Sequence, residues 1–276
     1  MPVLPSCLID PIWDQVATLL PPHQVTHPLR CHRPRTPDRV VFDTLVQVLV
    51  FGCAYARIAD DTCSATTRRR RRDEWIAAGV RDTLYTLVLA ADDRMIGLEL
   101  DELAVAGGMT TAPCGGEVAG RSPVNRGKQG RTRSLVVDAT GIPLGVIAAP
   151  ASQPDSPLLA PTLDTLGRLG PLPATTVHLD RGYDSGVTRQ RLAARGMHGE
   201  IAARGTPAPL TASQRGVVER THAWTDACKK LVWCTERRAA AVAFWLAFSA
   251  VIIIVRRLMR DGGTRYRWEG RPSRKP

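Results

Sequence analysis

Two acidic residues occupy positions from which a carboxylate can do chemistry. Asp180 directly follows the apolar run VHL, so it ends a predicted buried strand. The carboxyl ends of strands in open α/β sheets are where ligands bind. Glu219 lies in the segment RGVVERTHAW, which is predicted to be helical. Each residue also has an ordinary structural interpretation, because Asp180 can cap the next turn and Glu219 can pair with Arg215 one helical turn earlier.

Taken together, the two carboxylates favour a site for a hard divalent cation such as magnesium, which prefers oxygen ligands. Paired metal ions about 3.5–4 Å apart stabilise the attacking and leaving oxygens of a phosphodiester displacement. Such a site needs at least three carboxylates, because two ions require bridging and terminal ligands. Other catalytic classes are not supported: the chain lacks GxSxG and HExxH, and GRSPVNRGKQG departs from a Walker A loop at Ser122 and Gln129.

The charge balance points to a polyanionic partner. The 276-residue chain has a net charge of +11 and a pI near 9.9, and its 44% hydrophobic content is enough for a folded core. A basic protein of this kind favours nucleic acid or an acidic membrane surface, although a merely soluble basic protein has the same composition. The seven cysteines are scattered, with no CxxC pair, which favours a reducing cytoplasm.

One basic segment is a run of five arginines on a predicted helix that opens at Ser64. A short helix before it, around Ala56–Asp60, would complete a helix-turn-helix unit, whose second helix enters the DNA major groove. Trp75 would then face the core, and a solvated charged face is the alternative. The predicted DNA contacts from this helix are Arg68, Arg69, Arg71 and Arg72.

A second basic segment lies in the glycine- and proline-rich stretch after the first predicted strand, Gly115 to Gly130. A loop this long and this poor in apolar residues normally serves a ligand. Its basic residues, together with those of the strand that follows and of the helix bearing Glu219, predict a phosphate-contacting surface. The residues selected are Arg121, Arg126, Lys128, Arg131, Arg215 and Arg220, with Arg133 beside them.

Two further segments have competing interpretations. His23, His27, Cys31 and His32 match no standard zinc spacing and are interrupted by prolines, so a polar linker is favoured. Ala239–Val255 is an apolar run of 17 residues with arginines at both ends. That length is the lower limit for a membrane span, and a buried core helix is favoured. No secretory signal is expected at the start of the chain.

The order of predicted elements defines an α/β fold. Residues 8–95 are predicted to be helical, with Ile9–Leu20 and Asp38–Ala54 as helices and Asp38 as an N-cap. A strand at Leu103–Val105 is followed by a hairpin in RSLVVDATGIPLGVIAAPA. Then come a helix at Ser156–Leu169, the strand TTVHLD, a helix, the strand HGEIAARG and a helical region at Ser213–Leu258.

This order is that of a ribonuclease-H-like mixed sheet, with three antiparallel strands, then two parallel ones, and helices on both faces. Periodicity alone leaves other α/β folds with a mixed sheet open. The predicted division is a helical DNA-binding region over residues 1–98, the ribonuclease-H-like domain over 99–260, and a basic tail over 261–276.

Four segments carry a family resemblance. In their order and sequence they closely resemble DDE transposases of the bacterial insertion-sequence-five (IS4/IS5-like) type. The four segments are APCGGEVAGRSPVNRGKQG, GIPLGVIAAPASQPDSPLLAPTLDTL, HLDRGYDS and VVERTHAW. The resemblance covers about Ile9 to Leu258. It implies that the N-terminal helices bind terminal inverted repeats and that Asp, Asp and Glu hold two Mg²⁺ (or Mn²⁺) ions. It further implies hydrolytic nicking at transposon ends, transfer of a 3′-hydroxyl to target DNA, and a homodimer working in the cytoplasm without a membrane.

Matched position by position, the resemblance makes Asp180 the second catalytic Asp and Glu219 the catalytic Glu. The first Asp belongs in a VDG triplet, and here that triplet is VAG, with Ala106 in its centre. Glu102 lies about 13 Å away along the strand, and Asp138 on the neighbouring strand is the other nearby carboxylate. Asn125, Thr111 and Gly216 are further departures from the family pattern.

We therefore expect a transposase with weakened metal binding and impaired strand cleavage. The alternatives are a non-catalytic DNA-binding remnant that occupies transposon ends, and a membrane-anchored protein that uses Ala239–Val255.

Overall fold

The computed structural model describes residues 4–22, 35–201 and 213–265 of the chain. The histidine and cysteine cluster between His23 and His32 and most of the predicted basic tail lie outside these ranges. So does the side chain of Arg215.

The N-terminal part is helical, as predicted. It consists of α1 (Ser6–Leu19), α2 (Asp38–Phe51), the 3-10 turn η1 (Tyr55–Arg57), α3 (Ala65–Ala77) and α4 (Val80–Met95). Ser64 caps α3 as expected, because its Oγ accepts a hydrogen bond of 3.1 Å from the Thr67 amide. The predicted N-cap at Asp38 is wrong: Pro37 occupies the cap and Asp38 is the first helical residue.

A mixed sheet follows, built from β1 (Glu102–Thr111), β2 (Gly120–Arg121), β3 (Gln129–Asp138), β4 (Pro143–Pro150), β5 (Thr176–Leu179) and β6 (His198–Ile201). β3 pairs antiparallel with both β1 and β4, whereas β5 pairs parallel with β1 and with β6. Three antiparallel strands and then two parallel ones are the ribonuclease-H-like arrangement that the sequence predicts.

The first strand is longer than predicted. β1 continues past Val105 to Thr111, because its second half pairs in register with β3 as far as Thr111 and Gly130. The expected long loop therefore begins only at Ala112, and it contains the short strand β2.

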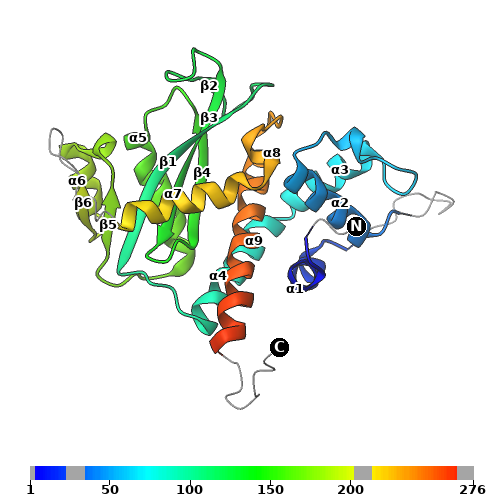
Figure 1. Cartoon of the computed structure of the whole chain (residues 1–276), viewed down its shortest axis with the longest axis horizontal. Helices are drawn as coiled ribbons and strands as arrows, with labels where there is room; N and C mark the ends of the chain where they lie inside the picture. The colour runs from blue at the N-terminus through cyan, green and yellow to red at the C-terminus, as the bar shows by residue number, and fades with distance from the viewer. Residues whose placement is uncertain (1–3, 23–34, 202–212, 266–276) are drawn as a thin grey trace, which may run out of the picture.

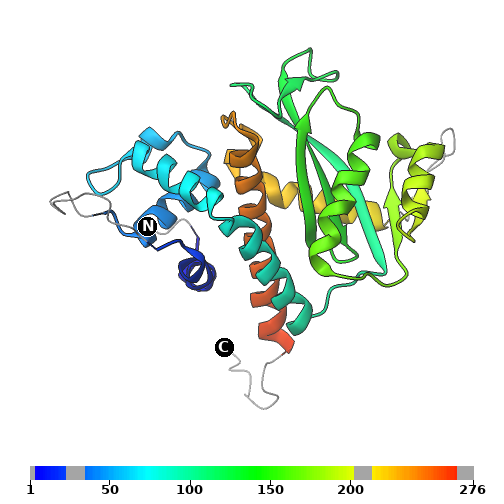
Figure 2. The same cartoon turned by 180° about the vertical axis from the view of Figure 1, so that it is seen from behind.

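Helices cover both faces of the sheet. α7 (Ser213–Asp226) crosses the face turned to the viewer in Figure 1, and α5 (Asp155–Asp164), with η2 (Thr165–Leu169), covers the other face (Figure 2). The remaining short elements are η3 (Arg181–Tyr183), α6 (Gly186–Ala193) and α8 (Lys229–Val232).

The last helix, α9 (Ala239–Arg265), lies between the sheet and the N-terminal helices (Figures 1 and 2). By length and composition α9 is able to cross a membrane, but 78% of its apolar window is buried inside the protein. It packs against α1 and α4 on one side and against β4 on the other. This burial matches the predicted core helix.

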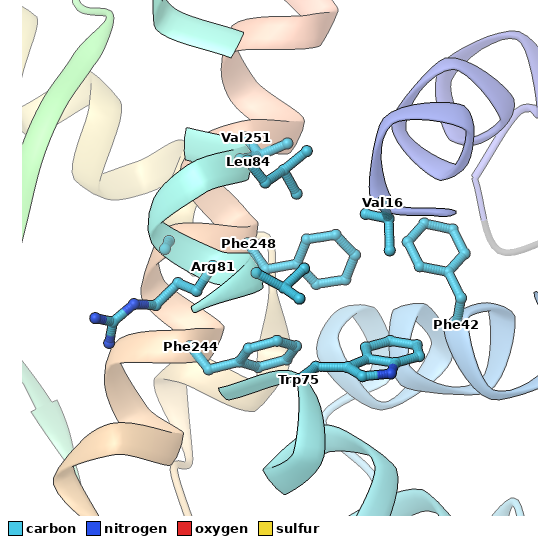
Figure 3. A pocket seen from close by; sticks show the side chains of 10 residues that line it. Val16, Phe42, Trp75, Arg81, Leu84, Phe244, Phe248 and Val251 are labelled. Atoms are coloured by element: carbon cyan, nitrogen blue, oxygen red, sulfur yellow. The ribbon is translucent and has the colours of Figure 1, made fainter. Parts of the chain in front are cut away.

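Aromatic side chains fill the junction between α9 and the N-terminal helices (Figure 3). The Phe42 ring from α2 meets the Phe248 ring from α9 edge to face, with their centroids 5.7 Å apart. Val16, Trp75 and Phe244 line the same small apolar hollow. Such aromatic contacts are large contributors to core stability.

A buried carboxylate, Glu236, joins the N-terminal helices to the segment between α8 and α9. Its carboxylate pairs with Arg72 at 2.8 Å and Lys230 at 3.0 Å, and it accepts a hydrogen bond of 3.0 Å from the Tyr55 hydroxyl. Its main-chain oxygen accepts a hydrogen bond from Arg131. Burial alone would raise the pKa of Glu236, but Lys230 and Arg72 outweigh burial and lower it.

α7 is fixed on the sheet by contacts along its length. Thr221 Oγ1 donates to the Gly141 carbonyl at 2.7 Å, and His222 Nε2 lies 3.3 Å from the Ala106 carbonyl oxygen. A Cβ atom on Gly108 would lie 2.6 Å from His222 Nδ1, so the ring requires a glycine there. Burial and the neighbouring Arg133 lower the pKa of His222 to about 4.

Replacing Glu236 with Gln should strongly destabilise the protein, because two buried cations would lose their counter-charge. Breaking a buried pair costs about 3–5 kcal/mol, which urea unfolding would measure.

The lowered pKa of Glu236 means that its contribution to stability is present above the usual carboxyl pKa. That contribution is lost as the pH falls through the pKa of Glu236 in the folded protein. The variant and the original protein should therefore converge in acid. Asp73→Asn, which removes the more exposed partner of Arg72 and Arg238, is the control and should cost at most about 1 kcal/mol. An equal effect of the two substitutions would contradict the central role of Glu236.

The low pKa of His222 predicts a loss of stability in mild acid. The pKa of a histidine in the unfolded chain is about 6.5. As the pH falls, the unfolded chain therefore binds a proton at this residue before the folded protein does. The free energy of unfolding should fall by about 2 kcal/mol between pH 7 and pH 5 from this group. His222→Gln should flatten that dependence, whereas His198→Gln, at an exposed position, should leave it unchanged. Urea titrations at the two pH values measure the free energy of unfolding. Parallel pH profiles for His222→Gln and the original protein would refute the role of His222.

Candidate active site

The parallel pairing of β1 and β5 places Ala106 beside Asp180. Val105 pairs with Leu179 in register, so the next residue on each strand comes to the same level. Neighbouring strands lie about 4.8 Å apart. β5 ends at Leu179 while β1 continues to Thr111, so the edge of β1 has no strand partner from Ala106 until Thr111, which bridges to Trp233.

Asp180 has the capping role that its position allows. One carboxylate oxygen accepts a hydrogen bond of 2.8 Å from the Gly182 amide and caps η3. The side chain is otherwise exposed at the carboxyl end of β5. An exposed carboxylate at this end of the sheet remains free to meet a ligand.

Glu219 is exposed on α7. Three and seven residues later, His222 contacts Ala106 and Asp226 pairs with Arg133 at 2.8 Å. Arg133 is in turn the register partner of Gly108. Glu219 therefore lies about one helical turn before the residue that contacts Ala106.

Ala106 contributes no donor to this site. Its methyl group is half-buried and packs on an apolar cluster that includes Leu135, Val137, Val217 and Val218. The position therefore belongs to the interface between the sheet and α7.

Neither carboxylate considered as a substitute is available. Asp138 is fully buried, accepts hydrogen bonds from the Thr140 and Ile142 amides, and pairs with Arg257 at 3.4 Å. It closes the turn between β3 and β4. Glu102 is held by a contact with the His178 ring on β5.

A third carboxylate near the site, Asp155, was missed by the sequence analysis. It lies in the first turn of α5, and a Cβ atom on Gly107 would lie 2.3 Å from its Oδ1. Burial, and then the charge of Asp180, raise the pKa of Asp155. A signal existed, because β4 runs parallel to β1, and the helix that follows β4 must begin at the same end of the sheet as Asp180.

Carboxylate oxygens are suitable ligands for a hard divalent cation, but there are too few of them here to hold two metal ions. Within the described ranges, no three His, Cys, Asp or Glu side chains stand close enough together to hold a metal ion. With Ala106 in the first position, the residues present do not fit a two-ion centre made by Asp, Asp and Glu.

The arginine run on α3 is largely internal. Arg68, Arg71 and Arg72 are buried: Arg68 donates to the Tyr55 carbonyl at 3.3 Å, Arg71 pairs with Asp38, and Arg72 pairs with Glu236. This burial is a correction to the predicted phosphate contacts. The spacing of 68, 71, 72 and 75 is that of one helix face, and Trp75 occupies it too.

The preceding element also differs from the prediction. The helix expected around Ala56–Asp60 is a single 3-10 turn, so the predicted helix-turn-helix pairing does not form there. Arg69 and Arg70 remain exposed on α3.

The basic residues of the β2–β3 hairpin also include both buried and exposed side chains. Arg131 is buried and donates to the carbonyls of Val118 and Glu236 at 3.1 Å each, so it is also a structural residue. Arg121, Arg126 and Lys128 are exposed, and we call these three the hairpin cations.

On α7, Arg220 is exposed as well. It donates to the Thr140 carbonyl at 2.9 Å and lies over the Trp224 ring at 5.3 Å.

Comparisons with known proteins agree with this arrangement. Residues 8–85 match the family described as "Putative transposase of IS4/5 family", and residues 87–254 match the transposase DDE domain. The chain is 34% identical over 148 residues to the "Putative transposase for insertion sequence element IS402" of Burkholderia cepacia, covering 51% of this chain and 70% of the relative.

The chain also has distant similarity to solved structures. One is the piggyBac transposase synaptic complex with hairpin DNA, at 11% identity and a TM-score of 0.39, covering 94% of this chain and 73% of that one. Another is the Mos1 transposase paired-end complex, at 10% identity and a TM-score of 0.32, covering 88% and 82%. The two family matches span most of the chain. This protein therefore belongs to the DDE transposases of the IS4/5 family.

Proposed function

We propose that this chain is an insertion-sequence transposase that binds the terminal inverted repeats of its element and is impaired in cleaving them. The observation that supports impairment is the register of β1 and β5, which sets Ala106 beside Asp180 where the family pattern has a catalytic Asp. Family membership supports the transposase itself and the use of a divalent metal.

The expected impairment follows from ligand chemistry. Removing a group that only orients a metal ligand costs about 10–100-fold in affinity or activity, and a missing direct ligand should cost more. Asp138 and Glu102 are engaged elsewhere and do not compensate. Asp180 and Glu219 are the family's remaining carboxylates, and Mg²⁺ or Mn²⁺ is the ion that they would bind more weakly.

The same observation favours a second candidate function, that of a non-catalytic DNA-binding protein. A folded protein that retains its basic surface and lacks cleavage would occupy transposon ends and compete with an active copy. Metal-dependent nicking separates the two functions, because only the first shows it.

The proposed DNA surface consists of the exposed cations. It includes Arg69 on α3, the hairpin cations and Arg220 on α7. Arg215 remains a proposed contact on the same helix. The DNA partners are the terminal inverted repeats and a target duplex, bound by a homodimer in the bacterial cytoplasm.

Ala106→Asp should restore cleavage. Supplying the carboxylate next to Asp180 should raise the rate of Mg²⁺-dependent nicking of inverted-repeat DNA by at least about tenfold. Ala106→Asn is the matched control, because it has nearly the same shape without the negative charge. A labelled inverted-repeat duplex resolved on a denaturing gel measures nicking. Equal nicking by the original protein and Ala106→Asp would show that the first carboxylate is not needed.

Removing hairpin cations should weaken DNA binding through the phosphate backbone. Arg121→Gln and Lys128→Gln should each lower affinity on any duplex and reduce the slope of log affinity against log salt by about 1. Arg260→Gln, which removes an exposed arginine at the end of α9, is the control and should change neither quantity. Fluorescence anisotropy at several salt concentrations gives both. Unchanged salt slopes for Arg121→Gln and Lys128→Gln would exclude the hairpin from the DNA surface.

A further inference from the structure

The residue that follows α8 is an exposed tryptophan. Trp233 is 61% exposed, whereas Trp75, for example, is buried in the core. The chain around it fixes this exposure, because Leu231 before it and Cys234 after it are both buried. The Cys234 amide also donates a hydrogen bond of 3.2 Å to the Thr111 carbonyl at the end of β1. Trp233 is thus held in place by its neighbours while its own ring stays uncovered.

A second exposed aromatic residue, Phe51, adjoins the same helix. α8 lies between the end of α2 and the end of β1 (Figures 1 and 2). A Cβ atom on Gly52 would come within 2.7 Å of the Lys229 carbonyl carbon, so α2 ends directly against α8. Phe51 is 60% exposed, and the Trp233 amide donates to the Lys229 carbonyl at 3.3 Å. Two uncovered aromatic residues, which we call the aromatic pair, therefore flank Lys229.

Cations adjoin the aromatic pair. Lys229 and Arg237 are exposed, and neither forms an ion pair with another residue in the described ranges. The nearby acids are engaged: Glu117 Oε2 accepts a hydrogen bond of 2.8 Å from the Ala239 amide at the start of α9, and Asp226 pairs with an arginine of β3. The charge beside the two rings is therefore positive.

The register of the sheet connects the aromatic pair to the hairpin cations. Gly120, next to Arg121, pairs with Gly130, and Gly130 pairs with Thr111. Thr111 in turn bridges to Trp233. At about 4.8 Å between neighbouring strands, this row spans about 14 Å from Gly120 to Trp233. About four stacked nucleotides of one DNA strand, at about 3.4 Å each, cover that distance.

Exposed aromatic rings beside cations are the combination that binds single-stranded DNA. The bases of an unpaired strand stack on aromatic side chains, and the cations contact its phosphates. In a duplex the faces of the bases are covered by their neighbours, so a ring at the protein surface does not reach them. A single exposed apolar residue needs no explanation, but two aromatic residues from distant elements flank the same lysine here. A protein partner would also cover the rings, but the positive charge favours a polyanion.

We propose that Phe51, Trp233 and Lys229 form a binding site for unpaired bases, and that a single strand adjoining the bound duplex runs from this site to the hairpin cations. Stacking is tolerant of sequence, so the site accepts any base. The inference rests on the proposed function for the duplex to which the strand is attached. The site itself is defined by α2, α8 and the end of β1, and it does not involve Asp180 or Glu219.

Three labelled inverted-repeat duplexes test the site: one blunt, one with a single-stranded thymidine tail, and one with an abasic tail of the same length. The two tails carry the same charge, but only the first has bases to stack. The original protein should bind the thymidine tail about fivefold or more tightly than the abasic tail, which is the effect of one stacked base. Trp233→Ala should remove this preference and leave the affinity for the blunt duplex unchanged. Fluorescence anisotropy measures all three affinities.

Two further variants separate stacking from a general effect on folding. Trp233→Phe keeps an aromatic ring and should retain most of the preference for the thymidine tail. Leu87→Ala, which shortens an exposed apolar residue of α4, is the control and should bind all three duplexes like the original protein. Stacking should also quench the fluorescence of Trp233, so the thymidine tail should quench the original protein more than Trp233→Phe.

Equal affinity of the original protein for the two tails, or an unchanged preference in Trp233→Ala, would overturn the proposal. A change in oligomeric state on sedimentation, with the preference for the thymidine tail unchanged, would assign the aromatic pair to a contact between copies of this chain and would also overturn it. Failure to bind the blunt duplex would count against the proposed function instead, because the comparison of the two tails tests the single-strand site by itself.

Discussion

The burial of α9 is the constraint on which the rest of the structure depends. Ala239–Val255 is apolar on every side, so no single neighbour can cover it. The N-terminal helices α1 and α4 cover one side, and β4 covers the other. Residues from both parts therefore belong to one hydrophobic cluster. The predicted boundary near residue 98 thus separates two regions of the sequence that share a core, and Glu236 adds a polar link between them through Arg72 and Tyr55.

Buried cations follow from this shared core. Arg68, Arg71, Arg131 and Lys230 are almost completely inside the protein, where each contacts a carboxylate or a carbonyl. Arginine suits such sites because its planar group donates several hydrogen bonds in fixed directions. A net charge of +11 thus overstates the surface available to DNA. Composition indicates the sign of the partner's charge. It does not distinguish an arginine that binds phosphate from an arginine that holds two helices together.

Local patterns predicted the elements, and long-range contacts decided the rest. The hairpin around Gly141, the strand just before Asp180 and the core helix followed from periodicity and turn residues. The length of β1 did not, because GGMTT is a poor strand sequence that is held by its pairing with β3. Asp155 was missed for a similar reason: its neighbours Gly107 and Asp180 are distant in the chain, and only the parallel order of the strands brings them together.

The fold does not need the carboxylate that Ala106 lacks. Acidic groups gathered around a metal repel one another when the metal is absent, so they contribute little to folding. The methyl group of Ala106 instead joins the apolar contact between β3 and α7, beside Leu135 and Val218. Gly107 and Gly108, the next two residues, admit Asp155 from one face and His222 from the other. This part of β1 is thus built from small residues so that neighbouring elements can approach closely. Under the proposed function, Ala106 stands where the family has a catalytic Asp, and an alanine there fits this close packing, so the sheet and its covering helices form without that carboxylate.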